Sequence, residues 1–328
     1  MTNTMFSGPL AQELTDFLEW RGGAGHGSRS ILRQLQTFDR FTQVTVSSSR
    51  LIDETFARAW LASAPGRGNN TRRSRYFLLR RICFFLADRQ PGTFLPTPAL
   101  CPRHLPPSLP HIYNPDEIRR LLKAASNLRD WDCWHPCPIR SHTLHAILVL
   151  LVTSGLRISE ALHLTVQDVD LNRGILAVRQ TKFRKSRLVP VSSGTLDGLR
   201  RYAAIRFRGG VADSDAAFFI SGRQRAYSYA MVSQLFHQIV ATAGIGNTSG
   251  RRPRLHDMRH TFAVTRLLLW YRAGENVMAR LPLLSTYLGH ACISDTEVYL
   301  QATSELLTEA NQRFHRFVAD ILPAGGEP

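Results

Sequence analysis

Three short segments of the chain concentrate residue types that could act on a phosphate group. They are residues 153–160 (TSGLRISE), 256–263 (HDMRHTFA) and 288–299 (LGHACISDTEVY). An arginine guanidinium stays charged at any working pH, and its planar fork matches the oxygens of a phosphate. Because the segments combine arginines and histidines without paired carboxylates, they predict a site for a phosphate.

The spacing inside the segments favours one shared site. His256 and Arg259 are three residues apart, so they share a face if this stretch is helical. Arg157 begins an expected helix directly after Gly155, where free backbone N–H groups also favour an anion. Taken singly, an arginine at a helix start is usually a surface charge, and a histidine or tyrosine on an apolar face is usually packing. The order and spacing of the whole set favour the functional interpretation.

These segments and a basic turn at residues 182–186 resemble the motifs of the tyrosine recombinase (phage integrase) family. Residues 153–160 are similar to its T-G-L-R-x-S-E box, with Ser154 as an additional residue, and residues 256–263 to its H-x-L-R-H-T-F-A box. Its L-G-H box, followed nine positions later by a tyrosine, resembles residues 288–299. The resemblance covers residues 139–302; the N-terminal half is similar only in kind, as a basic helical domain followed by a linker.

The hairpin lysine of the family, in patterns such as G-K-x-x-K-x-R-x-V-P, corresponds by register to Lys182. Thr181 replaces the glycine of that pattern, which leaves Lys185 as a competing candidate. The resemblance implies a catalytic set of six residues: Arg157, Lys182, His256, Arg259, His290 and Tyr299.

The resemblance also implies a role for each of these residues. Tyr299 attacks a DNA phosphodiester, which gives a 3′-phosphotyrosyl link and a free 5′-hydroxyl. Arg157, Arg259 and His290 hold the nonbridging oxygens, as charge grows in the transition state. Lys182 protonates the leaving 5′-oxygen and His256 assists proton transfer. The implied chemistry uses no metal, because the arginines replace it, and no nucleotide cofactor, because the phosphotyrosine keeps the bond energy.

Glu160, Asp257 and His260 are interpreted as support residues. The implied function is site-specific DNA recombination through a Holliday junction, for integration, excision or transposition of a mobile element. Two alternatives stay open: a type IB-like topoisomerase and a non-catalytic DNA-binding accessory protein. The intact set of arginines, histidine and tyrosine argues against the accessory protein.

Composition independently indicates a polyanionic partner. The 328 residues carry 41 Lys and Arg against 25 Asp and Glu, a formal net charge of +16. Residues 1–112 contribute +7 of this and the remainder +9, so both halves are basic. Double-stranded DNA is the expected partner. A membrane surface is disfavoured, because no polybasic amphipathic helix and no apolar run of spanning length is present. Without a signal peptide and with five scattered cysteines, the chain is expected in a bacterial cytoplasm, associated with the nucleoid.

The elements that must position the site divide into two domains. Seven prolines in residues 91–110 exclude a helix and favour an extended linker. We therefore expect a helical DNA-binding (core-binding) domain over residues 1–95, a linker over 96–112 and a catalytic domain over 113–328. The expected fold is mainly α with a small antiparallel β-sheet, and the resemblance implies a two-domain clamp around DNA.

Hydropathy patterns place four helices in the first domain. A basic cluster lies at the start of the last one, either as a solvated face or as a phosphate-contacting face. The DNA-binding candidates are Arg72, Arg73, Arg75, Arg80 and Arg81, with Lys185 and Arg187 from the hairpin.

The second domain combines helices with one expected hairpin. Asn114, Pro115 and Glu117 predict a capped helix start. The runs at 174–180 and 187–191 predict the hairpin. Cys133, His135 and Cys137 have a loose metal-ligand spacing but lack a second ligand pair.

A last amphipathic helix carries apolar residues from Leu306 to Ile321. It is expected to dock into a neighbouring protomer of a homo-oligomer, a tetrameric synapse on DNA, although its apolar stripe cannot tell whose core it joins. A sister recombinase or an accessory protein remains a possible partner.

Overall fold

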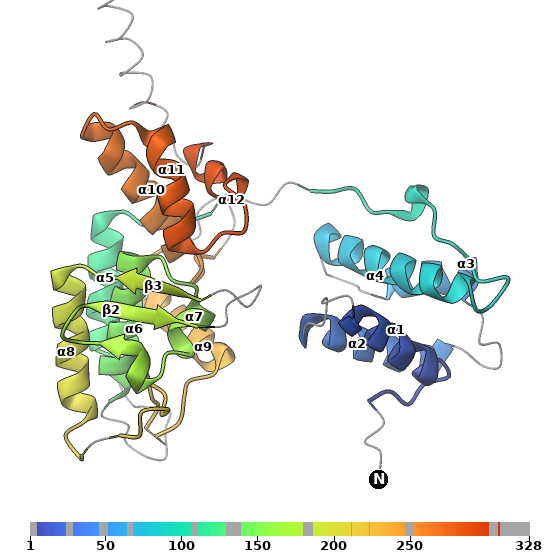
Figure 1. Ribbon diagram of the computed structural model, residues 1–328, viewed down its shortest axis with the longest axis horizontal. Coiled ribbons are helices and arrows are strands. Elements are labelled where there is room, and N and C mark those ends of the chain that lie inside the picture. Colours follow the sequence, from blue (N-terminus) through green and yellow to red (C-terminus); the bar gives the residue numbers. More distant parts are fainter. Residues whose placement is uncertain are drawn as a thin grey trace, which may run out of the picture. The chain divides into compact units, whose positions relative to one another are not determined.

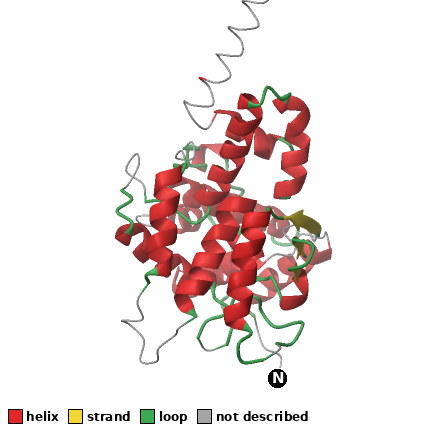
Figure 2. Cartoon of the chain, turned by 90° about the vertical axis from the view of Figure 1, so that its left-hand side faces the viewer, coloured by secondary structure: helices red, strands yellow, loops and turns green. Residues whose placement is uncertain are grey.

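A computed structural model of the chain divides into two compact units, Met1–Ser108 and Leu109–Pro328 (Figure 1). The structure describes residues 5–23, 29–45, 52–63, 68–105, 110–128, 139–179, 186–210, 212–222, 224–246, 252–301 and 308. Helices far outweigh strands, as Figure 2 shows by colour. The expectation of a mainly helical protein with a small antiparallel sheet is confirmed.

Unit 1 is built from the four helices that the hydropathy patterns predict. They are α1 (Ala11–Gly23), α2 (Arg29–Thr45), α3 (Glu54–Ala62) and α4 (Asn69–Ala87). Asp53 caps α3, since its side chain accepts a hydrogen bond from the backbone of Phe56. Trp60 and Phe38 pack edge to face at 5.0 Å between ring centroids in a core to which all four helices contribute.

The proline-rich segment does not leave unit 1 at residue 95. Its first half packs against α4: the Tyr76 hydroxyl donates to the carbonyl of Thr97, and Arg73 donates to that of Pro102. Pro98–Leu100 form a 3-10 turn (η1). The division between the units falls at 108/109, within the expected linker of residues 96–112.

Unit 2 places eight helices around one small sheet in the described part of the chain. They are α5 (Pro115–Ser126), α6 (Arg140–Ser154), α7 (Ile158–Leu162), α8 (Ser193–Arg206), α9 (Tyr229–Thr242), α10 (Asp257–Arg272), α11 (Val277–Leu288) and α12 (Ser294–Glu297). The capping box at Asn114 and Glu117 forms as predicted. Helix α11 contains Pro282 and begins five residues before that proline, after a start that Asn276 caps.

The sheet has three antiparallel strands in the order β1-β2-β3. They are β1 (Val169–Asp170), β2 (Ile175–Val178) and β3 (Arg187–Pro190), with Val178 opposite Arg187. The predicted strand pair is thus confirmed, whereas Lys182 and Lys185 of its turn lie outside the described residues. The cluster at Cys133–Cys137 and the C-terminal helix from Leu306 to Ile321 lie outside them as well.

Two apolar cores hold unit 2 together. The larger one joins α5, α6, α8 and α9 to the sheet, and the smaller one joins α10, α11 and Tyr299. The site residues lie where α10 and α11 meet α6 and α7. None of the helices in the described part of the chain has the length and apolarity that crossing a membrane requires.

Candidate active site

The turn after α6 brings Arg157 to the start of the site. Gly155 ends α6 in the left-handed conformation (φ +62°), and an added Cβ would lie 2.5 Å from Phe262 of α10. Only glycine fits there without strain and overlap. This close approach lets Arg157 reach the end of α11, where its Nη2 donates to the carbonyl of Gly289 at 3.1 Å.

Arg259 is the most deeply buried cation of the described site, at 2% exposure. It projects from α10, and its two terminal nitrogens donate to the carbonyls of Gly155 (2.8 Å) and Leu288 (2.7 Å). Both carbonyls lie at helix ends, where backbone acceptors lack an intrahelical partner. Burial and the charge of Arg157 lower the pKa of Arg259 to about 10, so the guanidinium remains charged at neutral pH.

Tyr299 lies against this cation at the end of the described chain. It is 4% exposed, in the 3-10 turn Val298–Gln301 (η3). Burial raises its pKa, although the charge of Arg259 and a hydrogen bond from it oppose the rise. The phenol is therefore neutral at rest, beside the cation that would stabilise its phenolate.

Two histidine rings contact the phenol, and a third lies next to one of them. The ring of His290 stacks on Tyr299 at 6.1 Å, and the ring of His260 meets Tyr299 edge-on at 5.4 Å. His256 stands on the far side of His260, at 4.8 Å from it. Desolvation and the nearby arginines lower the pKa of His290 to about 4, so its imidazole is neutral at pH 7.

Glu160 ties this site to the sheet. Its buried carboxylate accepts hydrogen bonds from the backbone and Nη1 of Arg157, and from both terminal nitrogens of Arg187. Burial would raise the pKa of Glu160, but the bonds and charges of Arg187 and Arg157 outweigh it and lower the pKa. The expected support role of Glu160 agrees with this geometry.

Arg187 differs from the expectation of a DNA-facing cation. Its guanidinium points inward, where Nε donates to the carbonyl of Tyr287 (2.8 Å) and the terminal nitrogens pair with Glu160. Its side chain is only 13% exposed. The register of β2 against β3 determines which face of the sheet the Arg187 side chain occupies. The run of basic residues around Arg187 does not indicate that register.

The described elements bring together four of the six expected catalytic residues: Arg157, Arg259, His290 and Tyr299. His256 lies one histidine away from the tyrosine, and Lys182 is outside the described residues. One contributor was not expected: Thr296, whose hydroxyl lies 2.6 Å from Nδ1 of His290. His260 was expected as a support residue, and its buried Nδ1 has no protein partner among the described residues. The sequence feature that could have indicated Thr296 is its position three residues before Tyr299, which places both side chains on one face of a helical turn.

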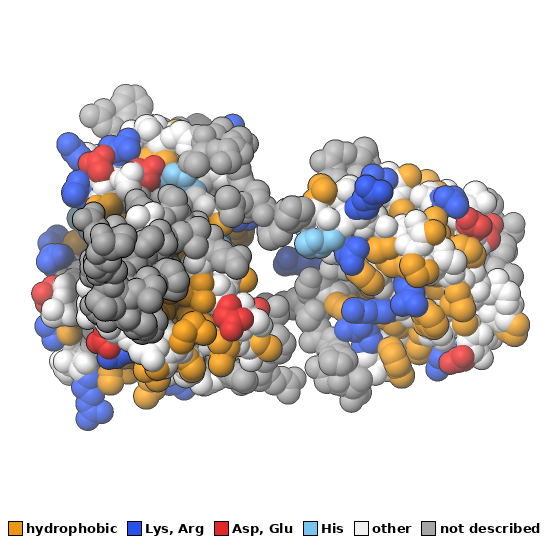
Figure 3. Space-filling model, turned by 90° about the horizontal axis from the view of Figure 1, so that it is seen from above, with side chains coloured by type: hydrophobic (Ala, Val, Ile, Leu, Met, Phe, Trp, Pro, Cys, Tyr) orange, Lys and Arg blue, Asp and Glu red, His pale blue; other side chains and the backbone are white. Residues whose placement is uncertain are grey.

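The arginines of unit 1 fall into two groups. Arg72 and Arg81 of α4 are exposed, whereas Arg73 and Arg75 donate to groups of unit 1 itself. Arg80 stacks over Phe84, itself 48% exposed, and Arg73 over Phe77. Figure 3 shows basic and hydrophobic side chains interleaved on the face of unit 1 that it presents.

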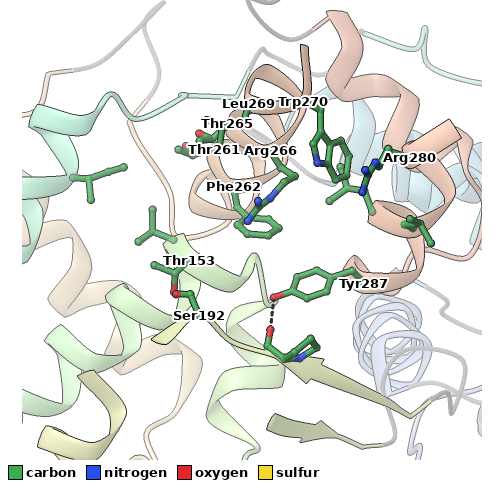
Figure 4. A pocket seen from close by; sticks show the side chains of 15 residues that line it. Thr153, Ser192, Thr261, Phe262, Thr265, Arg266, Leu269, Trp270, Arg280 and Tyr287 are labelled. Atoms are coloured by element: carbon green, nitrogen blue, oxygen red, sulfur yellow. Dashed lines mark hydrogen bonds between the residues drawn. The ribbon is translucent and has the colours of Figure 1, made fainter. Parts of the chain in front are cut away.

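A separate cavity of about 730 Å³ lies in unit 2 between α10 and α11. Its apolar lining includes Phe262, Trp270 and Leu284, with Arg266 and Arg280 beside them (Figure 4). Tyr287 closes one side, and its hydroxyl donates to the carbonyl of Pro190 at 3.1 Å. None of the expected catalytic residues that the structure describes lines this cavity.

Metal binding finds no support in the described residues, because no group of three or more His, Cys, Asp or Glu could hold an ion there. The cationic cluster can instead bind an anion. Two guanidiniums and a neutral imidazole around a buried phenol can hold a phosphodiester and stabilise the charge that develops on it.

Comparisons with known proteins agree with this chemistry. The sequence model of the phage integrase family matches residues 112–305. A putative integrase/recombinase of Sinorhizobium fredii, y4rE, is 35% identical over 315 residues, which cover 94% of this chain and 97% of that protein. The tyrosine recombinase XerA of Thermococcus kodakarensis is 29% identical over 65% of this chain and 66% of its own.

Solved structures show the same fold at lower identity. The integrase of transposon Tn1549, in complex with transposon right end DNA, superposes with a TM-score of 0.64 at 17% identity, over 94% of this chain and 99% of that one. The XerH recombinase bound to its difH substrate gives a TM-score of 0.61 at 19% identity, over 86% and 78% of the two chains.

Proposed function

The chain belongs to the phage integrase family and is a tyrosine site-specific DNA recombinase; we propose that Tyr299 is its nucleophile. The single observation that carries this assignment is the convergence of Arg157, Arg259 and His290 on one buried tyrosine. These residues are up to 142 positions apart in the sequence. Their meeting at one phenol is the arrangement that phosphoryl transfer through a phosphotyrosine requires.

In the proposed first step, the Tyr299 oxygen attacks the scissile phosphorus and the bond to the 5′-oxygen breaks. Arg157, Arg259 and His290 hold the nonbridging oxygens, so the growing charge meets donors that are already in place. The proton of the phenol passes toward His256, and Lys182 gives a proton to the leaving 5′-oxygen. Attack by the 5′-hydroxyl of a partner strand reverses the step, and exchange of both strand pairs passes through a Holliday junction.

Covalent trapping tests the nucleophile. A duplex that carries the end sequence of the encoding element and a nick near the cleavage point is incubated with the chain and separated under denaturing conditions. We expect a protein–DNA adduct from the wild type and none from Tyr299→Phe, with DNA binding retained. Tyr287→Phe is the matched control, because that hydroxyl bonds only to a backbone carbonyl across the neighbouring cavity. An adduct from Tyr299→Phe would refute the assignment.

We further propose that unit 1 and unit 2 together form a clamp on double-stranded DNA, with α4 of unit 1 contacting phosphates. Arg72 and Arg81 are exposed, and the half-buried Arg80 lies over the ring of Phe84, 4.7 Å from its centroid. Replacing Arg81 by Ala should weaken binding equally for all DNA sequences and reduce the slope of log K against log[salt] by about 1. Arg58→Ala is the control, since Arg58 is exposed but pairs with Glu54.

The finer assembly is proposed as a tetrameric synapse joined by the C-terminal segment. The cavity between α10 and α11 offers an apolar lining and two arginines, Arg266 and Arg280. Residues 302–328 supply an apolar stripe and acidic residues such as Glu305 and Glu309. Leu283, which lines the cavity and is 62% exposed, gives the test. Leu283→Glu should abolish synaptic complexes on DNA while a single site is still bound; undiminished synaptic complexes from this variant would contradict docking between protomers.

The biological setting is proposed as mobility of a DNA element, by integration, excision or transposition, within the cytoplasm and on the nucleoid. The relationship to an integrase/recombinase over nearly the whole chain supports this setting. A sister recombinase or an accessory protein would be a further partner. Recombination of two element ends by the purified chain alone would show that neither is required.

A further inference from the structure

The buried Thr296 lies beside His290 and has no role in the mechanism above. We infer that the Thr296 hydroxyl fixes His290 as the tautomer that carries its proton on Nε2, and that Thr296 is thereby a positioning residue of the reaction. The inference rests on the proposed function, because it concerns the donor that His290 offers to a phosphate oxygen.

The contact is short, and its threonine is fully buried. Oγ1 of Thr296 lies 2.6 Å from Nδ1 of His290, and Thr296 is 0% exposed. The two residues are held by different elements, since His290 follows the left-handed Gly289 at the end of α11, and Thr296 lies in α12. The backbone N–H of Thr296 donates to the carbonyl of Ile293 at 2.7 Å, which anchors the turn that carries the hydroxyl. A contact of this length inside the protein fixes both the ring orientation and one ring nitrogen.

The charges around His290 keep its imidazole ring neutral. Arg259, Arg157 and Arg187 face the imidazole, and Asp295 is the one carboxylate among its electrostatic neighbours in the described chain. Burial and these three cations keep the ring neutral, so it has a single N–H to give. Without a directing contact, that proton could sit on either nitrogen.

The Thr296 hydroxyl can donate to Nδ1 or accept from it, and we assign it as the donor. When the Thr296 hydroxyl donates to Nδ1, the lone pair of Nδ1 is occupied and Nε2 must hold the proton. In the opposite tautomer, Nε2 would present a lone pair to an anionic phosphate oxygen, which would repel it. A carboxylate partner would instead favour the charged imidazolium, as in many catalytic histidines. A threonine therefore suits a site where two arginines already supply the charge and the histidine supplies a neutral donor.

The same contact also couples the donor to the nucleophile. Thr296 precedes Tyr299 by three residues within one short helical stretch, α12 followed by η3. The stacked rings of His290 and Tyr299 complete a loop of contacts from the threonine through the histidine to the phenol. A change at Thr296 should therefore affect adduct formation without affecting DNA binding.

Three variants test the inference in single-turnover adduct formation on nicked DNA. Thr296→Val keeps the shape and removes the hydroxyl, and we expect adduct formation about tenfold slower, the loss of one well-formed hydrogen bond. Thr296→Ser restores the hydroxyl and should recover a rate within about threefold of the wild type. Thr143→Val is the matched control, because that threonine is equally buried in unit 2 but its hydroxyl donates to the backbone carbonyls of Ile139 and Ile220. It should lose stability but no catalytic rate per folded molecule.

The tautomer itself is read from the ¹⁵N resonances of histidine in the full-length chain, with His290 assigned by its loss in His290→Asn. We expect a pyridine-like Nδ1 and a pyrrole-like Nε2 in the wild type and in Thr296→Ser, and a mixture in Thr296→Val. A pyrrole-like Nδ1 in the wild type, or an undiminished rate in Thr296→Val, would overturn the inference. If the wild type forms no adduct at all, the proposed function fails, while the resonances still decide the tautomer.

Discussion

Replacing Glu160 by Gln tests whether the carboxylate between Arg157 and Arg187 holds the active site together. The substitution keeps the size of the side chain but removes the charge that balances two guanidiniums. Glu160 has a 4% exposed side chain and accepts three hydrogen bonds from them and a fourth from the backbone N–H of Arg157. Breaking a buried ion pair from one side costs about 3–5 kcal/mol, and the remaining amide oxygen places Gln near the lower end, at about 3 kcal/mol.

Urea unfolding of the full-length chain measures this change. For an m-value of about 2–3 kcal/mol/M, a loss of about 3 kcal/mol lowers the midpoint of unit 2 by about 1–1.5 M. The matched control is Asp197→Asn, which breaks an exposed pair with Arg200 on α8 and should cost less than about 1 kcal/mol. Adduct formation should also slow by about a hundredfold, because Arg157 would lose the group that orients it. A midpoint shift no larger than that of the control would refute the buried network.

Three further outcomes follow from the same geometry. Gly155→Ala should lower the free energy of unfolding, measured in urea, by about 2–5 kcal/mol, because the alanine would adopt a left-handed backbone conformation and its Cβ would overlap Phe262. Wild-type stability in this variant would contradict the close approach of Gly155 to α10. Arg187→Lys should lower stability by about 2 kcal/mol and slow adduct formation with unchanged DNA affinity, whereas a selective loss of affinity in a filter-binding titration would restore Arg187 as a DNA contact. The pKa values of His260 and His290 are lowered to about 4 by burial and by neighbouring arginines, so the fold favours their neutral forms. Their contribution to stability is complete above a pH of about 6.5 and declines as the pH falls toward 4, and a midpoint in urea that stays constant from pH 7.5 to 5.5 would contradict this.

The pattern of the sequence predicted the elements well where local rules govern them. The capped start at Asn114, the four amphipathic helices of unit 1 and the two strands around residues 175 and 189 all form as expected. Such features depend on residues a few positions apart, which a sequence displays directly. Pro282 is an exception to these local rules, because proline normally stands in the first turn of a helix and here lies within α11.

The identity of the reactive residues was also available from the sequence. Arg157, Arg259, His290 and Tyr299 were selected, before any contact was known, by the resemblance of their motifs to those of the tyrosine recombinase family. What the sequence could not supply is which partner each side chain finds. Arg187 carries the same charge as the lysine two residues before it, yet strand register turns it toward Glu160.

Only the tertiary structure decided how these residues cooperate. The carbonyls of Gly155 and Leu288 lack an intrahelical hydrogen-bond donor because two helices end there. They accept hydrogen bonds from Arg259 only because those helix ends pack against α10. The hydroxyl of Thr296 reaches His290 because the left-handed Gly289 ends α11 directly before His290, and α12 begins a few residues later. Composition, charge and local periodicity are properties of the chain in one dimension, and they determined the elements and the reactive groups. Hydrogen bonds between helix ends that are distant in the sequence form only when the helices pack in three dimensions. A local sequence pattern does not specify that packing.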